Sequence, residues 1–273
     1  MSVAALQRLL PQHGISRLAG RLARSQTPWV RRTFIQTFSR VYGVDLSEAL
    51  RSSPDDYESF NDFFTRELRA DTRPQPSDPL SVVCPADGSI SQAGRLTHDK
   101  LMQAKGTNYS LRSLTGMDLP QFHEGTFITV YLAPNDYHRV HLPVTAQLVR
   151  TTAIPGELFS VNARTEATIS DLFCRNERLV CHFESSHGDM LVILVGALIV
   201  ASIETVWPGP QSPFESRTEN HYGLRLERGS EIGRFLLGST VIVCFEPDRV
   251  ELDETLGTGA KVRMGQSIAQ LIG

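Results

Sequence analysis

The most apolar stretch of the chain, MLVILVGALIVASI from Met190 to Ile203, constrains the fold more than any other feature. It is shorter than the roughly 20 residues that a membrane-spanning helix needs. It is also rich in β-branched residues, contains a glycine and is followed at once by Glu204. Such runs are typical of strands that are buried on both faces of a sheet. We therefore expect two buried strands across residues 191–206.

The chain has the same character from about Leu80 onwards. Short apolar runs rich in β-branched residues alternate with glycine and proline, which indicates many short strands. The tail suggests two more strands around Gly265, whereas the polar segment Ser212–Gly223 is expected to be a mobile loop. The other predicted strands are Val82–Cys84, Ile90–Ala93, Phe127–Leu132, Ala146–Thr152, Leu179–Phe183, Gly223–Leu226 and Thr240–Phe245.

The first part of the chain has helical periodicity instead. Pro28 suits the first turn of a helix, and Ser59 is a typical N-cap residue. The sequence therefore predicts an α+β fold, with an amphipathic helical N-terminal region at residues 1–70. This region would sit on a β-rich body of barrel or sandwich character at residues 71–273. The predicted helices are residues 4–24, residues 28–42, Ser47–Arg51 and Phe60–Leu68.

The N-terminal region is basic and the body is acidic. Residues 1–40 contain seven arginines and no acidic residue, so a chain with a net charge of −3 carries −10 on the remainder. Helices of this kind either dock on the body or lie in the plane of an anionic membrane, and nucleic acid is the other class of anionic partner. Apolar insertion into a membrane is one role for the aromatic side chains here, and packing on the body is the other. These side chains are Trp29, Phe60, Phe63 and Phe64.

The composition excludes several classes of protein. A hydrophobic content of 41% with 21% charged residues is typical of a soluble globular protein. The N-terminus lacks the apolar core of a secretory signal, although its arginines leave a mitochondrial transit peptide as an alternative. The four cysteines have no C-x-x-C spacing. We expect them to be free thiols in the core, with neither a disulfide nor a metal site.

Three stretches carry residues that a structural role does not obviously require. Asp87 lies in PADGSI, where Asp-Gly is also an ordinary turn dipeptide. His138 and His141 lie in YLAPNDYHRVHLP, with a spacing that puts both on one face of a helix but on opposite faces of a strand. This spacing alone is weak evidence for a metal site, and one packed and one exposed histidine is the plainer expectation. Ser239 follows Gly238 at the entry to TVIVCF, where a turn is the plainer expectation.

Taken together, an Asp, a His and a Ser are the components of an activated nucleophile. Ser239 lacks the G-x-S-x-G context of a hydrolase elbow. It directly follows a glycine instead, whose carbonyl is sterically open because glycine has no Cβ. Attack of the serine Oγ on that carbonyl would convert the amide into an ester, which is a route to cleavage of the chain. The residues alone leave self-cleavage, a simple turn and a conventional serine hydrolase as alternatives.

A series of longer motifs runs from about residue 57 to the end of the chain. The motifs are FNDFFTREL, PADGSI, AKGTNYS, TVYLAPNDYHRVHLP, PGELFSVN, NERLV, VGALIVASIETVW and GSEIGRFLLGSTVIV. In these motifs and in their order, the sequence resembles the phosphatidylserine decarboxylases, specifically the longer, bacterial-type proenzymes. The basic N-terminal helices are also similar to those that this family uses to sit on membranes.

The resemblance implies that the chain processes itself. Proenzymes of this family cut themselves between the Gly and Ser of an LGST motif, here Gly238 and Ser239. The motif positions that match the self-cleavage triad are Asp87, His141 and Ser239.

The implied products are a β chain, residues 1–238, and an α chain, residues 239–273. They should stay associated because strands on both sides of the cut belong to one core. Ser239 would become a pyruvoyl group, a covalent cofactor that serves in place of pyridoxal phosphate and needs no metal.

The resemblance also implies a substrate and its catalytic residues. The expected activity is pyruvoyl-dependent decarboxylation of phosphatidylserine to phosphatidylethanolamine and CO2, with His138 protonating the product carbon. Ser160 and Asn162 match residues of the substrate pocket. The expected partners are phosphatidylserine and an anionic membrane surface, with no nucleic acid, and we expect the two-chain enzyme to dimerise further. It would lie peripherally on the cytoplasmic face of a bacterial plasma membrane, with the mitochondrial inner membrane as the alternative.

A different class of function is also compatible with parts of the sequence. The tail VRMGQSIAQL resembles the compact β-sandwich of carrier and phosphotransfer domains. A non-catalytic β-rich module of that kind would use His138 or His141 as a phosphate carrier or docking residue. It would not need the bond before Ser239 to break.

Overall fold

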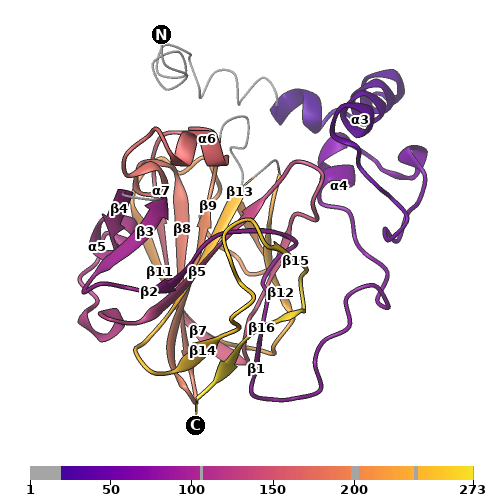
Figure 1. Ribbon diagram of the computed structural model, residues 1–273. Helices are drawn as coiled ribbons and strands as arrows, with labels where there is room; N and C mark the ends of the chain where they lie inside the picture. Colours follow the sequence, from indigo (N-terminus) through magenta and orange to yellow (C-terminus); the bar gives the residue numbers. More distant parts are fainter. Residues whose placement is uncertain (1–19, 105–106, 198–202, 237–238, 273) are drawn as a thin grey trace.

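The computed structural model describes residues 20–104, 107–197, 203–236 and 239–272. It confirms the α+β class, with a helical segment, the described part of residues 1–70, beside a β-rich body (Figure 1). Most of the helix expected at residues 4–24 lies outside the described residues, although residues 20–23 are helical. None of the described helices combines the length and the hydrophobicity that crossing a bilayer requires.

Helix α3, Pro28–Tyr42, has the bounds that its sequence predicts. Pro28 occupies the first turn, where its missing N–H has no helical partner to lose. Gly43 ends the helix with a φ of 65°, a left-handed conformation that glycine adopts without a steric penalty.

Helix α4, Phe60–Phe64, begins at the predicted cap and ends early. The hydroxyl of Ser59 accepts a backbone hydrogen bond from the first turn. The predicted continuation to Leu68 is wrong, because Leu68 forms a β-bridge with Ala49. The helix predicted at Ser47–Arg51 is wrong for the same reason, since these residues form a turn and that bridge.

The phenylalanines of α4 pack inside the helical segment. Phe60, Phe63 and Phe64 are fully buried, and the ring of Phe60 stacks on Phe34 of α3 with 4.3 Å between the centroids. Packing, rather than membrane insertion, is therefore the role of this Phe cluster. Trp29, in contrast, is 73% exposed.

An antiparallel sheet of eight strands forms the centre of the body, in the order β11–β7–β8–β9–β13–β5–β2–β15. Strand β9 comes from the most apolar stretch and is flanked by β8 and β13, as the sequence predicts. Within the described residues the sheet is open at β11 and β15, so the body is not a closed barrel. The strands are β2 (Gly88–Arg95), β5 (Thr126–Leu132), β7 (Ala146–Ile154), β8 (Arg178–Ser185), β9 (Gly188–Val195), β11 (Thr218–Leu226), β13 (Ser239–Phe245) and β15 (Lys261–Val262).

Smaller elements cover both faces of this sheet. The small sheets have the orders β1–β16–β14, β10–β12–β6 and β3–β4. Their strands are β1 (Ser81–Val83), β3 (Lys100–Ala104), β4 (Thr107–Ser110), β6 (Arg139–His141), β10 (Ile203–Thr205), β12 (Glu231–Phe235), β14 (Val250–Leu252) and β16 (Ser267–Leu271). The short helices of the chain are α5 (Leu111–Thr115), α6 (Ala163–Glu166), α7 (Leu172–Arg175) and the 3-10 turns η1 (Pro54–Asp56) and η2 (Pro120–Phe122).

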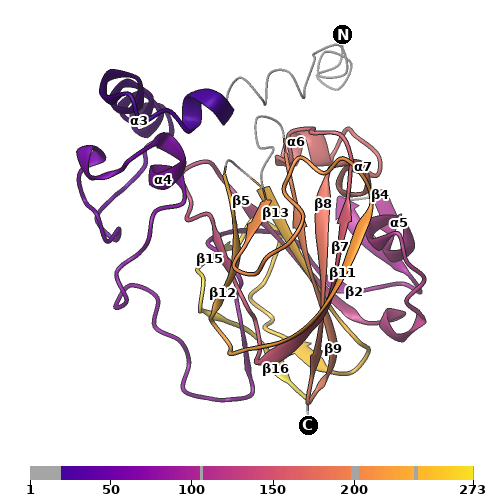
Figure 2. The same ribbon diagram turned by 180° about the vertical axis from the view of Figure 1, so that it is seen from behind.

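The large sheet separates two hydrophobic cores. Successive side chains of a strand point to opposite faces. On β13, Val241 and Val243 face a core shared with β6, β12 and β16, whereas Ile242 and Cys244 face a core shared with α5 and α7. Figure 2 shows α5, α6 and α7 on the side of the body away from α3 and α4.

Each strand predicted from an apolar run overlaps an observed strand. The pair expected across residues 191–206 is β9 and β10, and the pair expected around Gly265 is β15 and β16. The loop expected at Ser212–Gly223 is wrong in its second half, because Thr218 begins β11. All four cysteines are free, and burial raises the pKa of each thiol.

The helical segment makes polar and ring contacts with the body. The ring of Phe64 lies 4.0 Å from that of His138, centroid to centroid, and Arg139 Nε donates to the carbonyl of Thr65 at 2.9 Å. The division of the chain at residue 70 stays a prediction. These contacts place residues of the first part directly against residues of the second.

Candidate active site

The predicted site residues come together at one edge of the large sheet, by which we mean the edge formed by the ends of its strands and not an outer strand. Ser239 is the first residue of β13 and pairs with Leu132, the last residue of β5. Asp87 immediately precedes β2, whose residue Ser89 pairs with Tyr131 on the other side of β5. The ends of three neighbouring strands therefore bring Asp87 and Ser239 to the same edge.

Two of the connections, or crossings, between the large sheet and the β10–β12–β6 sheet at this edge carry predicted site residues. One crossing leads from β5 to β6 and carries His138, and the other leads from β12 to β13 and ends at Ser239. The backbone N–H of Phe235, the last residue of β12, donates to the carbonyl of His138 at 3.0 Å. The two crossings are thus tied together where the predicted chemistry takes place.

Ser239 is fully buried and carries an unpaired hydroxyl. Its exposed fraction is 0%, and its Oγ has no hydrogen-bond partner among the described residues. By alternation along β13, its side chain shares the face of Val241, which is the face toward β6 and β12. A buried hydroxyl without a partner is costly unless the site uses it.

His138 also has a buried polar atom without a hydrogen-bond partner in the described structure. Its Nδ1 lies 2.8 Å from the carbonyl oxygen of Asp136, whereas its Nε2 is buried without a hydrogen-bond partner among the described residues. Burial, and then the charge of Arg66, lower the pKa of His138 to about 3. The imidazole is therefore neutral at pH 7, and because a carbonyl only accepts, its hydrogen lies on Nδ1 and its lone pair on Nε2.

His141 is paired with a tyrosine. Its Nδ1 lies 2.8 Å from the carbonyl oxygen of Gly229, so Nδ1 carries the hydrogen. Its Nε2 lies 3.0 Å from the hydroxyl of Tyr137, which therefore donates to it. Burial lowers the pKa of His141 and raises that of Tyr137. This arrangement keeps His141 neutral, with its basic nitrogen occupied by the Tyr137 hydroxyl.

Asp87 is held by an arginine rather than by a histidine. Its carboxylate pairs with Nε and Nη2 of Arg73 and accepts the backbone N–H of Met264 at 2.8 Å. No hydrogen bond links Asp87 to His141 within the described part of the chain. The charge of Asp87 still raises the pKa of His141, against the larger effect of burial, so the two side chains are in electrostatic range.

Gly88 has a packing reason beyond the turn. A Cβ at this position would lie 2.3 Å from the carbonyl oxygen of Tyr131. Only glycine lets β2 approach β5 this closely directly after Asp87. The glycine of the Asp-Gly dipeptide therefore has a packing role beside β5 in addition to any role in a turn.

The two histidines do not behave as one packed and one exposed residue. His138 and His141 are 0% and 8% exposed, so that expectation is wrong. His141 ends β6 while His138 precedes the strand, and their ring nitrogens contact different partners. Among the described residues, no group of three or more His, Cys, Asp and Glu side chains is placed to hold a metal ion.

Ser160 and Asn162 follow β7 at the same edge of the sheet. The Oδ1 of Asn162 accepts the backbone N–H groups of Arg164 and Thr165 at 3.1 and 3.2 Å and so caps α6. Its Nδ2 donates to the Oγ of Ser160 at 2.9 Å. Asn162 thus has a structural role, and the role of both residues in substrate binding stays a prediction.

Two of the hollows in the described part of the molecule bear on the location of the site. One of 430 Å³ lies between the helical segment and the body and is lined by Asp87, Arg66 and Tyr137 among others. A larger one of 780 Å³ lies at the opposite edge of the sheet, around Val144 and the turn between β8 and β9. The larger hollow contains none of the predicted site residues, so the smaller one is the candidate entrance to the site.

Comparison with known proteins identifies the family. A family model described as "Phosphatidylserine decarboxylase" matches residues 60–270, and a second, described as "PSD", matches residues 3–43. The chain belongs to the phosphatidylserine decarboxylase family. It is 48% identical to a protein of Methylococcus capsulatus, over 97% of this chain and 95% of the relative. It is 47% identical to one of Azotobacter vinelandii, over 97% and 96%. Both are called phosphatidylserine decarboxylase proenzyme.

The structure of this phosphatidylserine decarboxylase family member adds two partners that the sequence prediction missed. Tyr137 lies in the same motif as both histidines, so its place next to His141 had a local signal that was not used. Arg73 lies in the Pro-rich segment after α4 and reaches Asp87 only through the fold. The contact had no local signal.

A buried carboxyl group lies behind the sheet in this family member. Glu166 of α6 is 6% exposed, and Ser91 of β2 donates a hydrogen bond to its Oε2. Burial raises the pKa of Glu166 to about 7, although the hydrogen bond from Ser91 opposes this shift. The folded state therefore favours the neutral form of Glu166.

We expect Glu166→Gln to stabilise the protein at neutral and alkaline pH but not at about pH 4. A carboxyl whose folded pKa is raised favours folding below its unfolded value of 4.5, and this advantage is lost as the pH rises toward 7. The variant should match the parent near pH 4 and exceed its free energy of unfolding above about pH 8 by up to about 3 kcal/mol. Urea unfolding at both pH values measures the difference, and a gap that does not change with pH would contradict it.

Proposed function

We propose that this chain decarboxylates phosphatidylserine to phosphatidylethanolamine and CO2 after cutting its own backbone between Gly238 and Ser239. One observation carries the proposal. Two polar atoms, Ser239 Oγ and His138 Nε2, are buried without partners where the two crossings meet. One is a nucleophile and the other a base that is neutral at pH 7.

The first step is the attack of Ser239 Oγ on the carbonyl carbon of Gly238. The proton of the hydroxyl passes to His141, the base that family resemblance assigns, and the amide becomes an ester with a free amine at residue 239. In the described conformation the Tyr137 hydroxyl occupies His141 Nε2, so the proton travels through that hydroxyl or the hydroxyl moves aside. Asp87 stabilises the imidazolium through its charge, from a position fixed by Arg73.

The second step breaks the ester. Elimination breaks the bond between the ester oxygen and Cβ of residue 239, which releases a β chain ending in the carboxylate of Gly238 and leaves dehydroalanine at residue 239. Water then hydrolyses the dehydroalanine, which releases ammonia and supplies the carbonyl oxygen of the pyruvoyl group. The surroundings fit this group, because Ser239 is fully buried and no hydrogen bond to another described residue holds its Oγ. A pyruvoyl group binds the amine of a substrate covalently and withdraws electrons from the bond to the carboxylate of that substrate, as pyridoxal phosphate does in other enzymes.

His138 accepts and donates a proton during turnover. The substrate amine arrives as an ammonium ion and must lose a proton before it reacts. The lone pair on His138 Nε2 can accept this proton and later deliver it to the carbon that has lost CO2. The ring of Phe64 packs against that of His138 with an angle of 40° between the ring planes, and His138 is fully buried.

The two chains would remain one molecule. Strand β13 belongs to the α chain, and it is hydrogen-bonded to β5 on one side and β9 on the other, both from the β chain. Separation would expose the middle of the large sheet. We therefore infer a stable association of the two chains after cleavage.

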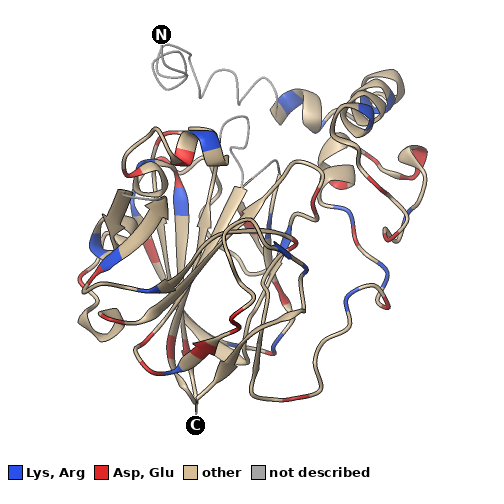
Figure 3. Ribbon diagram, viewed as in Figure 1, with Lys and Arg blue, Asp and Glu red and all other residues tan. Residues whose placement is uncertain are grey.

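The helical segment supplies a surface for the membrane that holds the substrate. Its exposed apolar side chains include Trp29 and Val41, 73% and 68% exposed. Arginines lie on the same helices (Figure 3). Such a surface suits peripheral binding to anionic lipid, with about 1 kcal/mol for each basic residue near the surface. We propose the cytoplasmic face of a bacterial plasma membrane as the location.

The direct test uses the purified, full-length protein and lipid vesicles. Vesicles of phosphatidylserine in phosphatidylcholine should yield equal amounts of CO2 and phosphatidylethanolamine, and vesicles of phosphatidylcholine alone should yield neither. Phosphatidylserine that persists unchanged, or release of free serine, would contradict the proposed function.

A further inference from the structure

Arg66 carries a buried charge that forms no direct ion pair within the described residues, although the charges of Asp87 and Asp136 act on it from farther away. The residue is only 4% exposed. Its Nη2 donates to the carbonyl oxygens of Asn135 and Asp136 at 2.9 and 3.3 Å. Its Nε and Nη1 are buried without a hydrogen-bond partner among the described residues.

An arrangement of this kind is unfavourable unless an anion completes it. Removing a cation from water carries an effective penalty of several kcal/mol, which paired anions and hydrogen bonds normally offset. The guanidinium lies 5.9 Å from the ring centroid of Phe63, a contact of modest strength. Two carbonyls and one ring leave part of its hydrogen-bonding capacity unused.

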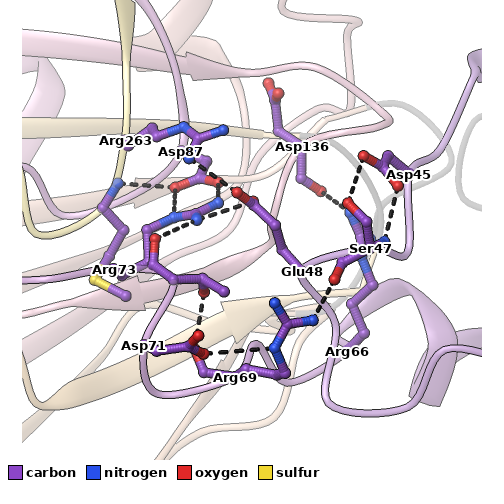
Figure 4. Close-up of polar contacts among 12 residues, drawn as sticks. Asp45, Ser47, Glu48, Arg66, Arg69, Asp71, Arg73, Asp87, Asp136 and Arg263 are labelled. Atoms are coloured by element: carbon purple, nitrogen blue, oxygen red, sulfur yellow. Dashed lines mark hydrogen bonds and ion pairs between the residues drawn. The ribbon is translucent and has the colours of Figure 1, made fainter.

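The unused donors belong to a residue that lines the 430 Å³ hollow beside Asp87. Four cations line this hollow, and two of them are engaged by acids. Arg73 pairs with Asp87 and Glu48, and Arg263 pairs with Glu48 (Figure 4).

The other two cations of the hollow are Arg66 and Lys261, and neither forms an ion pair with a described residue. Lys261 Nζ contacts only the hydroxyl of Ser89, at 3.3 Å, among its described neighbours. An anion that enters the hollow therefore meets two cations without an ion-pair partner, in a lining that also contains the carboxyl groups of Asp45 and Asp136.

One backbone carbonyl connects Arg66 to the proposed catalytic base. The carbonyl oxygen of Asp136 accepts from Arg66 Nη2 and also lies 2.8 Å from His138 Nδ1. The charge of Arg66 is also felt at His138. An anion bound at Arg66 would thus be linked to the ring of His138 through one backbone carbonyl.

We propose that Arg66, assisted by Lys261, binds the phosphodiester of the substrate headgroup in this hollow. The inference rests on the proposed function for the identity of the substrate. The serine headgroup offers two anions, a carboxylate and a phosphodiester. A cation on the carboxylate would stabilise the charge that must disappear when neutral CO2 leaves, which would raise the barrier. The phosphodiester keeps its charge throughout, so a buried guanidinium holds it without that penalty.

The test compares Arg66→Gln and Arg66→Lys with the parent enzyme and with Arg69→Gln. Arg69 lies nearby but is half-exposed and does not line the hollow. Intact mass first verifies that each protein has formed two chains. With dihexanoyl phosphatidylserine in solution, Arg66→Gln should raise KM at least tenfold while kcat changes less than threefold. Arg66→Lys should be intermediate and Arg69→Gln should match the parent.

Two kinetic outcomes would overturn the inference. An unchanged KM in Arg66→Gln would show that the guanidinium does not bind substrate. A collapse of kcat with an unchanged KM would mean that Arg66 acts only through His138. Lys261→Gln changes an exposed side chain and is not expected to affect folding. It should raise KM about threefold, so the inference remains testable if the Arg66 variants fold poorly.

A binding measurement separates this inference from the proposed function. Calorimetry with sn-glycero-3-phosphoethanolamine, which contains the phosphodiester, should detect binding to the parent protein and at least tenfold weaker binding to Arg66→Gln. Inorganic phosphate should bind much more weakly than the phosphodiester, and equal binding would assign the site to free phosphate instead. Failure of the parent to decarboxylate phosphatidylserine would refute the proposed function. The binding measurement would still test whether Arg66 binds a phosphodiester.

Discussion

Ser239→Ala should remain a single full-length chain and should have no detectable decarboxylase activity. Ser239 Oγ is the only atom in the proposed pathway that can attack the preceding carbonyl, and it is also the source of the pyruvoyl group. Both functions disappear with one oxygen, whereas the fold should persist, because the hydroxyl makes no hydrogen bond among the described residues. A denaturing gel and a vesicle assay measure the two losses.

The neighbouring residue offers a matched control. Thr240 is also fully buried with an unpaired hydroxyl, but by alternation it points to the opposite face of β13. Thr240→Val, which keeps the shape of the side chain, should therefore be cut and active. Two chains in Ser239→Ala, or an uncut Thr240→Val, would place the nucleophile elsewhere.

His138→Gln should be cut normally but should lose decarboxylase activity by a factor of at least about 100, the usual contribution of a positioned acid–base group. Its Nε2 faces no described hydrogen-bond partner, so the proposal assigns it to the substrate rather than to processing. The amide of glutamine approximates the size of the imidazole but cannot carry a proton between two positions. Single-turnover assays on the processed variant measure the effect on chemistry.

His141→Gln provides the reciprocal result. His141 is the proposed base for cleavage, so this variant should accumulate as the uncut chain. If both variants cut normally, or if both fail to cut, the division of labour between the two histidines would be wrong. Near-normal turnover by His138→Gln would also reject its assigned role.

Sequence patterns predicted the elements whose signals are local. The bounds of helix α3 match the prediction, which used Pro28 as the start signal, and the structure shows that Gly43 ends the helix through its left-handed conformation. The long apolar runs predicted the central strands β9 and β13 because burial on two faces requires apolar residues throughout. Where a distant partner decides, prediction failed, as in the β-bridge between Ala49 and Leu68 that ends α4 early.

Short strands with mixed composition were also missed. Strand β6 has the sequence RVH and β12 has EIGRF, and neither is long or regular enough to show a period of two. They form because they pair with each other, at Arg139 and Arg234 for example, and cover one face of the large sheet. This small sheet positions both histidines, so a part of the fold with a weak sequence signal supports the chemistry.

The candidate site was likewise predictable where the signal is local and not where contacts between distant segments decide. Residue types singled out Asp87, His138, His141 and Ser239, and the fold gathers them at one edge. The sequence could not show which of them bond to each other, because the partners of Asp87 and His141 come from segments far apart along the chain. A hydrogen-bonded Ser-His-Asp arrangement was the simplest expectation, and tertiary contacts replace it in the described structure.

The intact mass of the purified protein under denaturing conditions tests the central claim most directly. The account predicts two species, residues 1–238 and residues 239–273. The smaller should be lighter, by the mass of one ammonia, than a peptide that begins with serine. A single species of 30.3 kDa, with an ordinary serine after FLLG, would contradict the account.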